Sequence, residues 1–145
     1  MTLPPNMLTA LQYGNLHSED KKTAVGALLA RGYKQIAYGA NKLVLPVEDF
    51  WSAAKYPRIV HAEIDCLVNF LRMQVPVEPL KNLQLYVTLE PCSECCKFII
   101  FTRKYTNIDK VYVWNRRSEG SGVHLLLESS IQVEFVEGVA YEEQF

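Results

Sequence analysis

Two short clusters of residues in this sequence have the side chains and the spacing of a metal site. The first is His61-Ala62-Glu63, and the second is Pro91-Cys92-Ser93-Glu94-Cys95. Imidazole and thiolate groups are the usual protein ligands of zinc, and three such ligands leave a fourth position for water. On a helix that begins after Pro91, Cys92 and Cys95 share one face, and the free amides at its start favour thiolates. The sequence therefore predicts a zinc ion held by His61, Cys92 and Cys95.

Glu63 is the candidate catalytic residue. It follows His61 by two positions, so the two side chains point in different directions, one to the metal and the other past it to a substrate. The pattern H-x-E followed by P-C-x-x-C, with 30 residues between His61 and Cys92, resembles the signature of zinc nucleobase deaminases. Zinc lowers the pKa of a bound water toward ~7. We expect Glu63 to take its proton, pass it to a ring nitrogen and then protonate the departing amine, as base and then as acid.

A purely structural zinc site is the alternative interpretation of the same cysteines. Such a site usually has four protein ligands. Cys96 offers a fourth, because it lies four residues after Cys92 on the same helix face. A zinc module of this kind would bind without catalysing a reaction. Cys66 is expected to be a small core residue.

The elements that must position these clusters follow from the hydrophobic pattern. We predict helices over 5–16, 59–73, 92–104 and 122–129, the second ended by Pro76, and strands over 24–30, 35–40, 83–89, 110–114 and 131–136. The first two strands read as a hairpin, and residues 41–57 as a loop with two prolines. Strands that alternate with helices favour an α/β fold, a three-layer α/β/α sandwich around a central mixed sheet. We expect a single domain over residues 1–145.

Composition narrows the class of protein further. The chain has 145 residues, of which 49% are hydrophobic and 21% charged, and its formal net charge is −1. These values suit one compact soluble domain and lack the basic character of nucleic-acid-binding domains. The N-terminus lacks the regions of a signal peptide, and no run approaches the ~18 apolar residues of a membrane span. We therefore expect a cytoplasmic protein with no membrane or nucleic-acid partner, whose clustered thiols bind metal.

Four stretches carry a resemblance to a known family. They are residues 18–27 (SEDKKTAVGA), 38–41 (YGAN), 55–63 (KYPRIVHAE) and 85–92 (LYVTLEPC). Over nearly the whole chain the sequence resembles the deoxycytidylate (dCMP) deaminases of the cytidine deaminase superfamily. The last stretch is shared with tRNA adenosine deaminases, whereas residues 55–63 favour the dCMP enzymes. The resemblance implies a five-stranded sheet, one zinc per chain and a homo-oligomer, dimer or hexamer. It also implies that Asn41 contacts the sugar and the backbone of Ala62 contacts the base.

The predicted function is hydrolysis of a small pyrimidine nucleotide, dCMP by preference, to dUMP and ammonia. Trp114 ends a strand that the resemblance brings to the pocket, where it forms either core or a wall against the base. Arg116 is a candidate for contact with the phosphate, and so are Arg117, Lys42 and Arg58. The alternative is a nucleic-acid deaminase that acts on a tRNA adenosine or a single-stranded cytosine.

Overall fold

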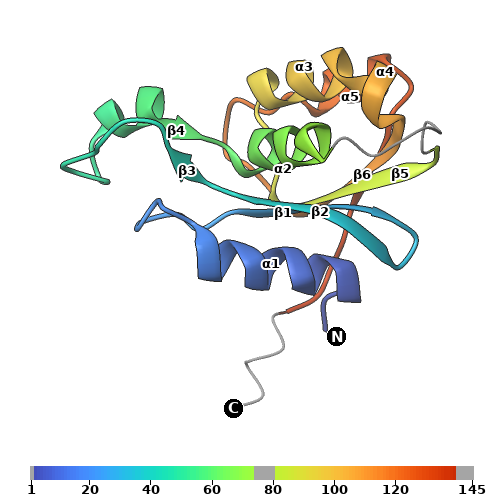
Figure 1. Ribbon diagram of the computed structural model, residues 1–145, viewed down its shortest axis with the longest axis horizontal. Coiled ribbons are helices and arrows are strands. Elements are labelled where there is room, and N and C mark those ends of the chain that lie inside the picture. The colour runs from blue at the N-terminus through green and yellow to red at the C-terminus, as the bar shows by residue number, and fades with distance from the viewer. Residues whose placement is uncertain (1, 74–80, 140–145) are drawn as a thin grey trace.

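The centre of the molecule is a mixed sheet. The computed structural model describes residues 2–73 and 81–139, and within them five strands pair in the order β2-β1-β5-β6-β7 (Figure 1). β1 pairs antiparallel with β2 and β5, whereas β5, β6 and β7 run parallel. The five-stranded mixed sheet predicted above is confirmed. Its strands are β1 (Gly26–Arg31), β2 (Lys34–Ala40), β5 (Leu83–Leu89), β6 (Ile108–Asn115) and β7 (Gln132–Phe135).

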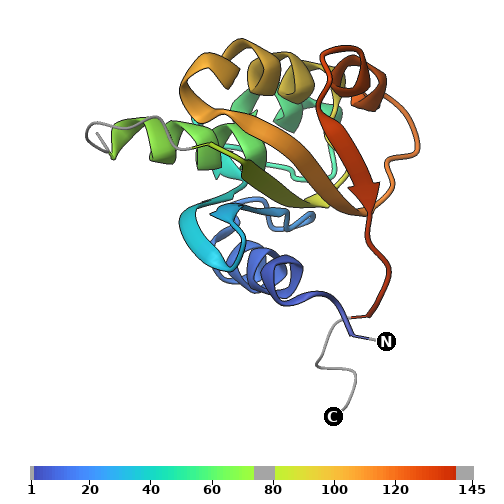
Figure 2. The same cartoon turned by 90° about the vertical axis from the view of Figure 1, so that its right-hand side faces the viewer.

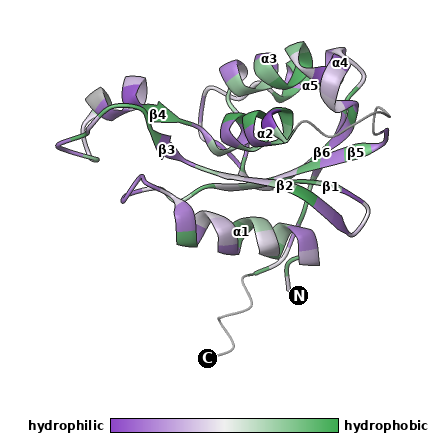
Figure 3. Ribbon diagram, viewed as in Figure 1, coloured by the Kyte–Doolittle hydropathy of each residue, from purple (hydrophilic) through white to green (hydrophobic). Residues whose placement is uncertain are grey.

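Helices cover both faces of this sheet and complete the three layers of an α/β/α sandwich (Figures 1 and 2). α1 (Pro5–His17) lies on one face, and α2 (Ala62–Arg72), α3 (Ser93–Phe101), α4 (Arg103–Thr106) and α5 (Val123–Glu128) lie on the other. β1 is buried along nearly its whole length, as expected of a central strand between two helical layers. Much of α3 and α5 is hydrophobic (Figure 3), and the main core lies between α2, α3 and α5 and the sheet. None of the described helices combines the length and the apolar character of a membrane span.

The segment before His61 contains more regular structure than the predicted loop. β3 (Lys42–Leu43) pairs antiparallel with β4 (Ile59–Val60), and a 3-10 helix, η1 (Ala53–Arg58), precedes β4. The prediction of a helix from Ile59 is wrong by three residues, since α2 begins at Ala62. The β-branched residues of β4 favour a strand, and their pairing with β3 leaves His61 in an extended conformation as the N-cap of α2.

The helix predicted over 92–104 is in fact two helices. α3 ends at Phe101 because the Thr102 hydroxyl donates back to the carbonyl of Phe98 at 2.8 Å and the Thr102 backbone leaves helical values. The short α4 then ends at Asn107, whose φ of 51° is left-handed. As a result, β6 starts at Ile108, two residues before the predicted strand. Pro76, the predicted end of the second helix, lies outside the described residues.

Candidate active site

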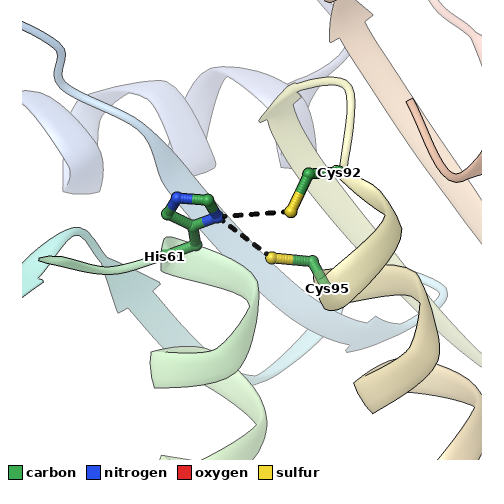
Figure 4. Close-up of side chains that lie close together, drawn as sticks. All are labelled: His61, Cys92 and Cys95. Carbon is green, nitrogen blue, oxygen red and sulfur yellow. Dashed lines mark hydrogen bonds between the residues drawn. The ribbon is translucent and has the colours of Figure 1, made fainter. Parts of the chain in front are cut away.

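The three predicted metal ligands converge at the starts of two helices. His61 is the N-cap of α2 and Cys92 is the N-cap of α3, with Cys95 in the first turn of α3. Nδ1 of His61 lies 3.2 Å from Sγ of Cys95 and 3.6 Å from Sγ of Cys92. Figure 4 shows the imidazole pointing at both sulfurs. The three ligand atoms all lie within 4.8 Å of one another, so one ion can contact all of them.

The arrangement fits zinc with three protein ligands. Bonds of about 2.3 Å to sulfur and about 2.0–2.1 Å to nitrogen at tetrahedral angles separate ligand atoms by about 3.6 Å, close to the spacing found here. Hydrogen bonds from Cys95 and His61 lower the pKa of Cys92, and the bond to Cys92 raises the pKa of Cys95, because it holds the Cys95 proton against the Cys92 sulfur. That proton is released when a metal binds both sulfurs as thiolates.

Cys96 does not join this cluster. Its thiol is buried and faces the carbonyl of Pro91, with Sγ at 3.8 Å from the oxygen. Burial raises the pKa of the Cys96 thiol to about 12. Within the described part of the chain, the group able to hold a metal consists of His61, Cys92 and Cys95. The four-ligand alternative therefore lacks its fourth member.

Glu63 stands beside the ligands in the second position of α2. Its side chain is buried, at 3% exposed, and lines a cavity together with His61. Burial raises the pKa of the Glu63 carboxyl, and a hydrogen bond from its own backbone amide offsets part of that effect. A carboxyl that holds a proton more readily than usual suits a group that must both accept and return protons near neutral pH.

The cavity extends from the ligands to polar groups that come from distant segments. Its wall includes Asn41, at the end of β2, which is 4% exposed. Nδ2 of Asn41 donates to the carbonyl of Thr23 at 2.9 Å, whereas its Oδ1 is buried without a hydrogen-bond partner in the described structure. A buried acceptor in this state indicates a place for a ligand's donor. The other lining residues are Asp20, Thr23, Val25, Lys55, Tyr56, Ile59, His61, Glu63, Leu89 and Arg117.

A buried ion pair forms part of the cavity wall. Nζ of Lys55 lies 2.9 Å from Oδ2 of Asp20, and the two side chains are 4% and 3% exposed. Burial alone would raise the pKa of Asp20, but hydrogen bonds from Lys55 and from the amides of Lys22 and Thr23 outweigh it, so the pKa is lowered. An ammonium carries three donors, and Asp20 takes one of them.

Arg117 brings a second cation to the cavity. Its Nε donates to the backbone carbonyl of Glu90 at 3.0 Å, and its amide donates to the Glu90 carboxylate at 3.0 Å. The hydroxyl of Ser121 donates to the other carboxylate oxygen, and Ser121 forms a β-bridge with Cys92. The buried Glu90 thus ties the segment that carries Arg117 to the turn that carries a metal ligand.

The other predicted site residues lie elsewhere. Trp114 packs with Leu3 and Val136 on the side of α1, and its Nε1 donates to the carbonyl of Gly138 at 3.0 Å. Of the two roles considered for Trp114, these contacts match core packing. The guanidinium of Arg116 lies 3.7 Å from the ring centroid of Phe135. Neither Trp114 nor Arg116 is among the residues that line the cavity.

Ala62 is fully buried at the first turn of α2, between His61 and Glu63. The sequence interpretation missed Asp20, Lys55 and Glu90 as site residues, although all three lie in the stretches that carry the family resemblance.

A three-ligand zinc site with a buried carboxylate beside it, on this sandwich fold, defines the class of zinc-dependent deaminases. The family model "Cytidine and deoxycytidylate deaminase zinc-binding region" matches residues 5–114. The chain belongs to this family, whose cofactor is the zinc that the three ligands are positioned to hold.

Known relatives agree with this assignment. The chain is 32% identical over 94 residues to the deoxycytidylate deaminase of Homo sapiens, which covers 57% of this chain and 50% of the human protein. It is 33% identical over 97 residues to the tRNA-specific adenosine deaminase of Buchnera aphidicola subsp. Schizaphis graminum, covering 67% of this chain and 58% of that protein. The chain therefore spans about half the length of the curated relatives it matches.

A solved structure covers more of the fold. The dCMP deaminase from the cyanophage S-TIM5, in complex with dCMP and dUMP, superimposes with a TM-score of 0.72 at 26% sequence identity. The match includes 90% of this chain and 93% of the phage chain.

Proposed function

We propose that this protein hydrolyses dCMP to dUMP and ammonia. The observation that carries the proposal is the buried Glu63 beside the cluster of His61, Cys92 and Cys95, at one end of a cavity with two cations in its wall. The complex of the phage dCMP deaminase with dCMP and dUMP supports the choice of substrate.

Glu63 would move the protons of this reaction. When bound, zinc would lower the pKa of a water toward about 7 and so make it a nucleophile near neutral pH. The Glu63 carboxylate accepts the proton of the attacking water and donates it to N3 of the ring, which makes C4 electrophilic. The oxygen of the water bonds to C4, and Glu63 then accepts the remaining proton of that hydroxyl and passes it to the amino group. The C4–N bond breaks, the C4 carbonyl forms and ammonia leaves. Burial of Glu63 keeps bulk water away from these transfers.

The remaining contacts follow from the groups around the cavity. The partnerless Oδ1 of Asn41 would accept a hydrogen bond from a sugar hydroxyl, and the backbone of Ala62 would contact the base. Lys55 and Arg117 are the cavity cations that would meet the 5′-phosphate. The sequence-based contacts of Arg116 with the phosphate and of Trp114 with the base stay predictions. Both side chains would have to turn toward the cavity to make them.

A substrate panel tests the proposal. Zinc-loaded protein is given cytidine, deoxycytidine, CMP, dCMP and dCTP, and ammonia release is measured. We expect the highest kcat/KM for dCMP. A preference for nucleosides would refute the phosphate contacts but leave deamination standing, and no ammonia from any of them would refute the function.

A nucleic-acid deaminase is the second candidate, because a tRNA-specific adenosine deaminase shares 33% identity over 97 residues. The net charge of −1 argues against it, since phosphate backbones select basic surfaces. Turnover of a tRNA anticodon stem-loop or of a cytosine-containing single strand, with dCMP left unchanged, would favour this candidate.

We also propose that residues 1–145 form one deaminase domain and that the protein assembles into a homo-oligomer in the cytoplasm. A reducing compartment keeps zinc-binding thiols available. An apolar surface hollow lined by Phe98, Ile100, Phe101 and Leu125 supports the assembly, since exposed apolar patches mark interaction sites. Phe101 itself is 74% exposed. Light scattering coupled to size exclusion measures the subunit number, and a monomer at micromolar concentration would contradict it.

A further inference from the structure

α2 is fastened to the edge strand of the sheet by its side chains. β2 pairs with β1 on one side only, so every second residue of β2 directs its backbone groups away from β1. Oδ2 of Asp65 accepts from the amide of Ala40 at 3.0 Å, and Nδ2 of Asn69 donates to the carbonyl of Tyr38 at 2.8 Å. Asp65 and Asn69 lie four residues apart, one helical turn, and they satisfy two outward groups that lie two residues apart on the strand.

Gly39 allows this close approach. A Cβ at Gly39 would lie 2.3 Å from the carbonyl oxygen of Ala62 and 2.4 Å from the amide of Cys66, both in the backbone of α2. No side chain fits in that space, so the helix backbone rests directly on the strand. The contact is made by the same first turn of α2 that carries Glu63.

The bond from Asp65 acts at the residue before Asn41. The backbone carbonyl of Asn41 accepts from the amide of Glu19 at 2.9 Å, and its Nδ2 donates to the carbonyl of Thr23 at 2.9 Å. The Asp65 bond holds the Gly39–Ala40 peptide, which precedes the peptide that joins Ala40 to Asn41. With these three restraints in place, Oδ1 is the side-chain atom of Asn41 that is left without a partner, in a residue that lines the cavity.

We propose that Asp65 is a positioning residue for substrate binding, which acts through Asn41. α2 carries the proton-moving Glu63, follows its N-cap His61 and, through Asp65, holds the end of β2 that leads into Asn41 in the cavity wall. One rigid helix therefore sets the spacing between the reacting end and the sugar end of the substrate. This inference rests on the proposed function, because it gives the partnerless Oδ1 of Asn41 a substrate hydroxyl to bind.

The test is a double-mutant cycle with a matched control. We expect Asp65→Ala to lower kcat/KM for dCMP about tenfold, mostly through KM, as loss of one well-placed hydrogen bond to substrate does. Asp65→Asn keeps an acceptor for the amide of Ala40 and should recover most of the loss. In the Asn41→Ala background, Asp65→Ala should have little further effect, because coupled residues are not additive. Asn69→Ala breaks the neighbouring bond to β2 and should leave kcat/KM within about twofold.

Equal losses from Asp65→Ala and Asn69→Ala, full additivity with Asn41→Ala, or no recovery by Asp65→Asn would each overturn the inference. A second measurement is independent of turnover. In the NMR spectrum of zinc-loaded protein, the side-chain amide signal of Asn41 should shift or broaden in Asp65→Ala and stay in place in Asn69→Ala. An unmoved signal in Asp65→Ala refutes the positioning role. Absence of dCMP turnover in the unmutated protein refutes the proposed function instead.

Discussion

Replacing Gly122 by alanine should weaken zinc binding by displacing the turn that carries Cys92. A Cβ at this position would lie 2.6 Å from Cα of Ser93 and 2.9 Å from the carbonyl oxygen of Cys92. Carbon atoms in contact normally lie about 3.5–4.0 Å apart, so Gly122→Ala must move the Cys92 turn by roughly 1 Å. A zinc site tolerates deviations of about 0.2 Å in its ligand distances. We therefore expect zinc affinity to fall by about 10–100-fold, the range seen when groups that support metal ligands are altered.

Competition with a chromophoric chelator measures this affinity, and Gly120→Ala in the same loop is the control. Gly120 has a φ of +77°, and a Cβ there meets no atom within 4 Å. Its substitution should cost about 1–3 kcal/mol of stability through backbone strain, with zinc affinity unchanged. If Gly122→Ala binds zinc as tightly as the unmutated protein, the close packing of Gly122 against Ser93 and Cys92 does not position the metal ligand.

Three further results are expected. Asp20→Asn should destabilise the protein at neutral pH by about 3–5 kcal/mol, since it leaves Lys55 buried without a counter-charge. Because the folded pKa of Asp20 lies below its ordinary value of 3.8, the pair stabilises the fold above that value and the stability is lost as pH falls through the folded pKa. Thermal melts at decreasing pH should thus show the gap between the two proteins closing in acid, and a constant gap would refute the assignment. Cys96→Ala should keep one zinc per chain by atomic absorption, whereas loss of the metal would restore the four-ligand site. Arg117→Ala should lower kcat/KM for dCMP by about 10–100-fold, as loss of a charge-assisted hydrogen bond does, and leave kcat/KM for deoxycytidine unchanged. Arg116→Ala should change kcat/KM for neither substrate, because the Arg116 side chain lies over the Phe135 ring outside the cavity. A larger loss in Arg116→Ala than in Arg117→Ala would instead make Arg116 the phosphate contact, as the sequence predicted.

The two cysteines of the cluster could be placed together from the sequence because their spacing is local, whereas His61 was joined to them by the pattern H-x-E followed by P-C-x-x-C. Cys92 and Cys95 are fixed by one helical turn, and the strand before them carries an unmistakable apolar pattern. The mixed sheet was predictable from the alternation of strands and helices, and the resemblance supplied the number of its strands. The break at Thr102 was not, because it depends on one hydroxyl that bonds back to the preceding turn.

The cavity wall was less predictable because it depends on long-range packing. Asp20 and Lys55 are 35 residues apart in sequence, and their pairing depends on how η1 folds over the cavity. Arg116 and Arg117 are adjacent in sequence, but Arg117 lines the cavity, with its Nε donating to the carbonyl of Glu90. The sequence alone does not show which of the two makes this bond. Asp65 has a polar side chain on a helix, and its role depends on a strand that comes 25 residues earlier.

The deamination rate of a zinc-loaded Glu63→Gln variant tests the central claim most directly, with the metal content measured on the same sample. The side chain of Glu63 is buried beside the ligands without being one of them. We therefore expect one zinc per chain and a kcat for dCMP lowered by about 10²–10⁴, the usual contribution of a general acid–base group. Retention of full activity with zinc bound would contradict the account.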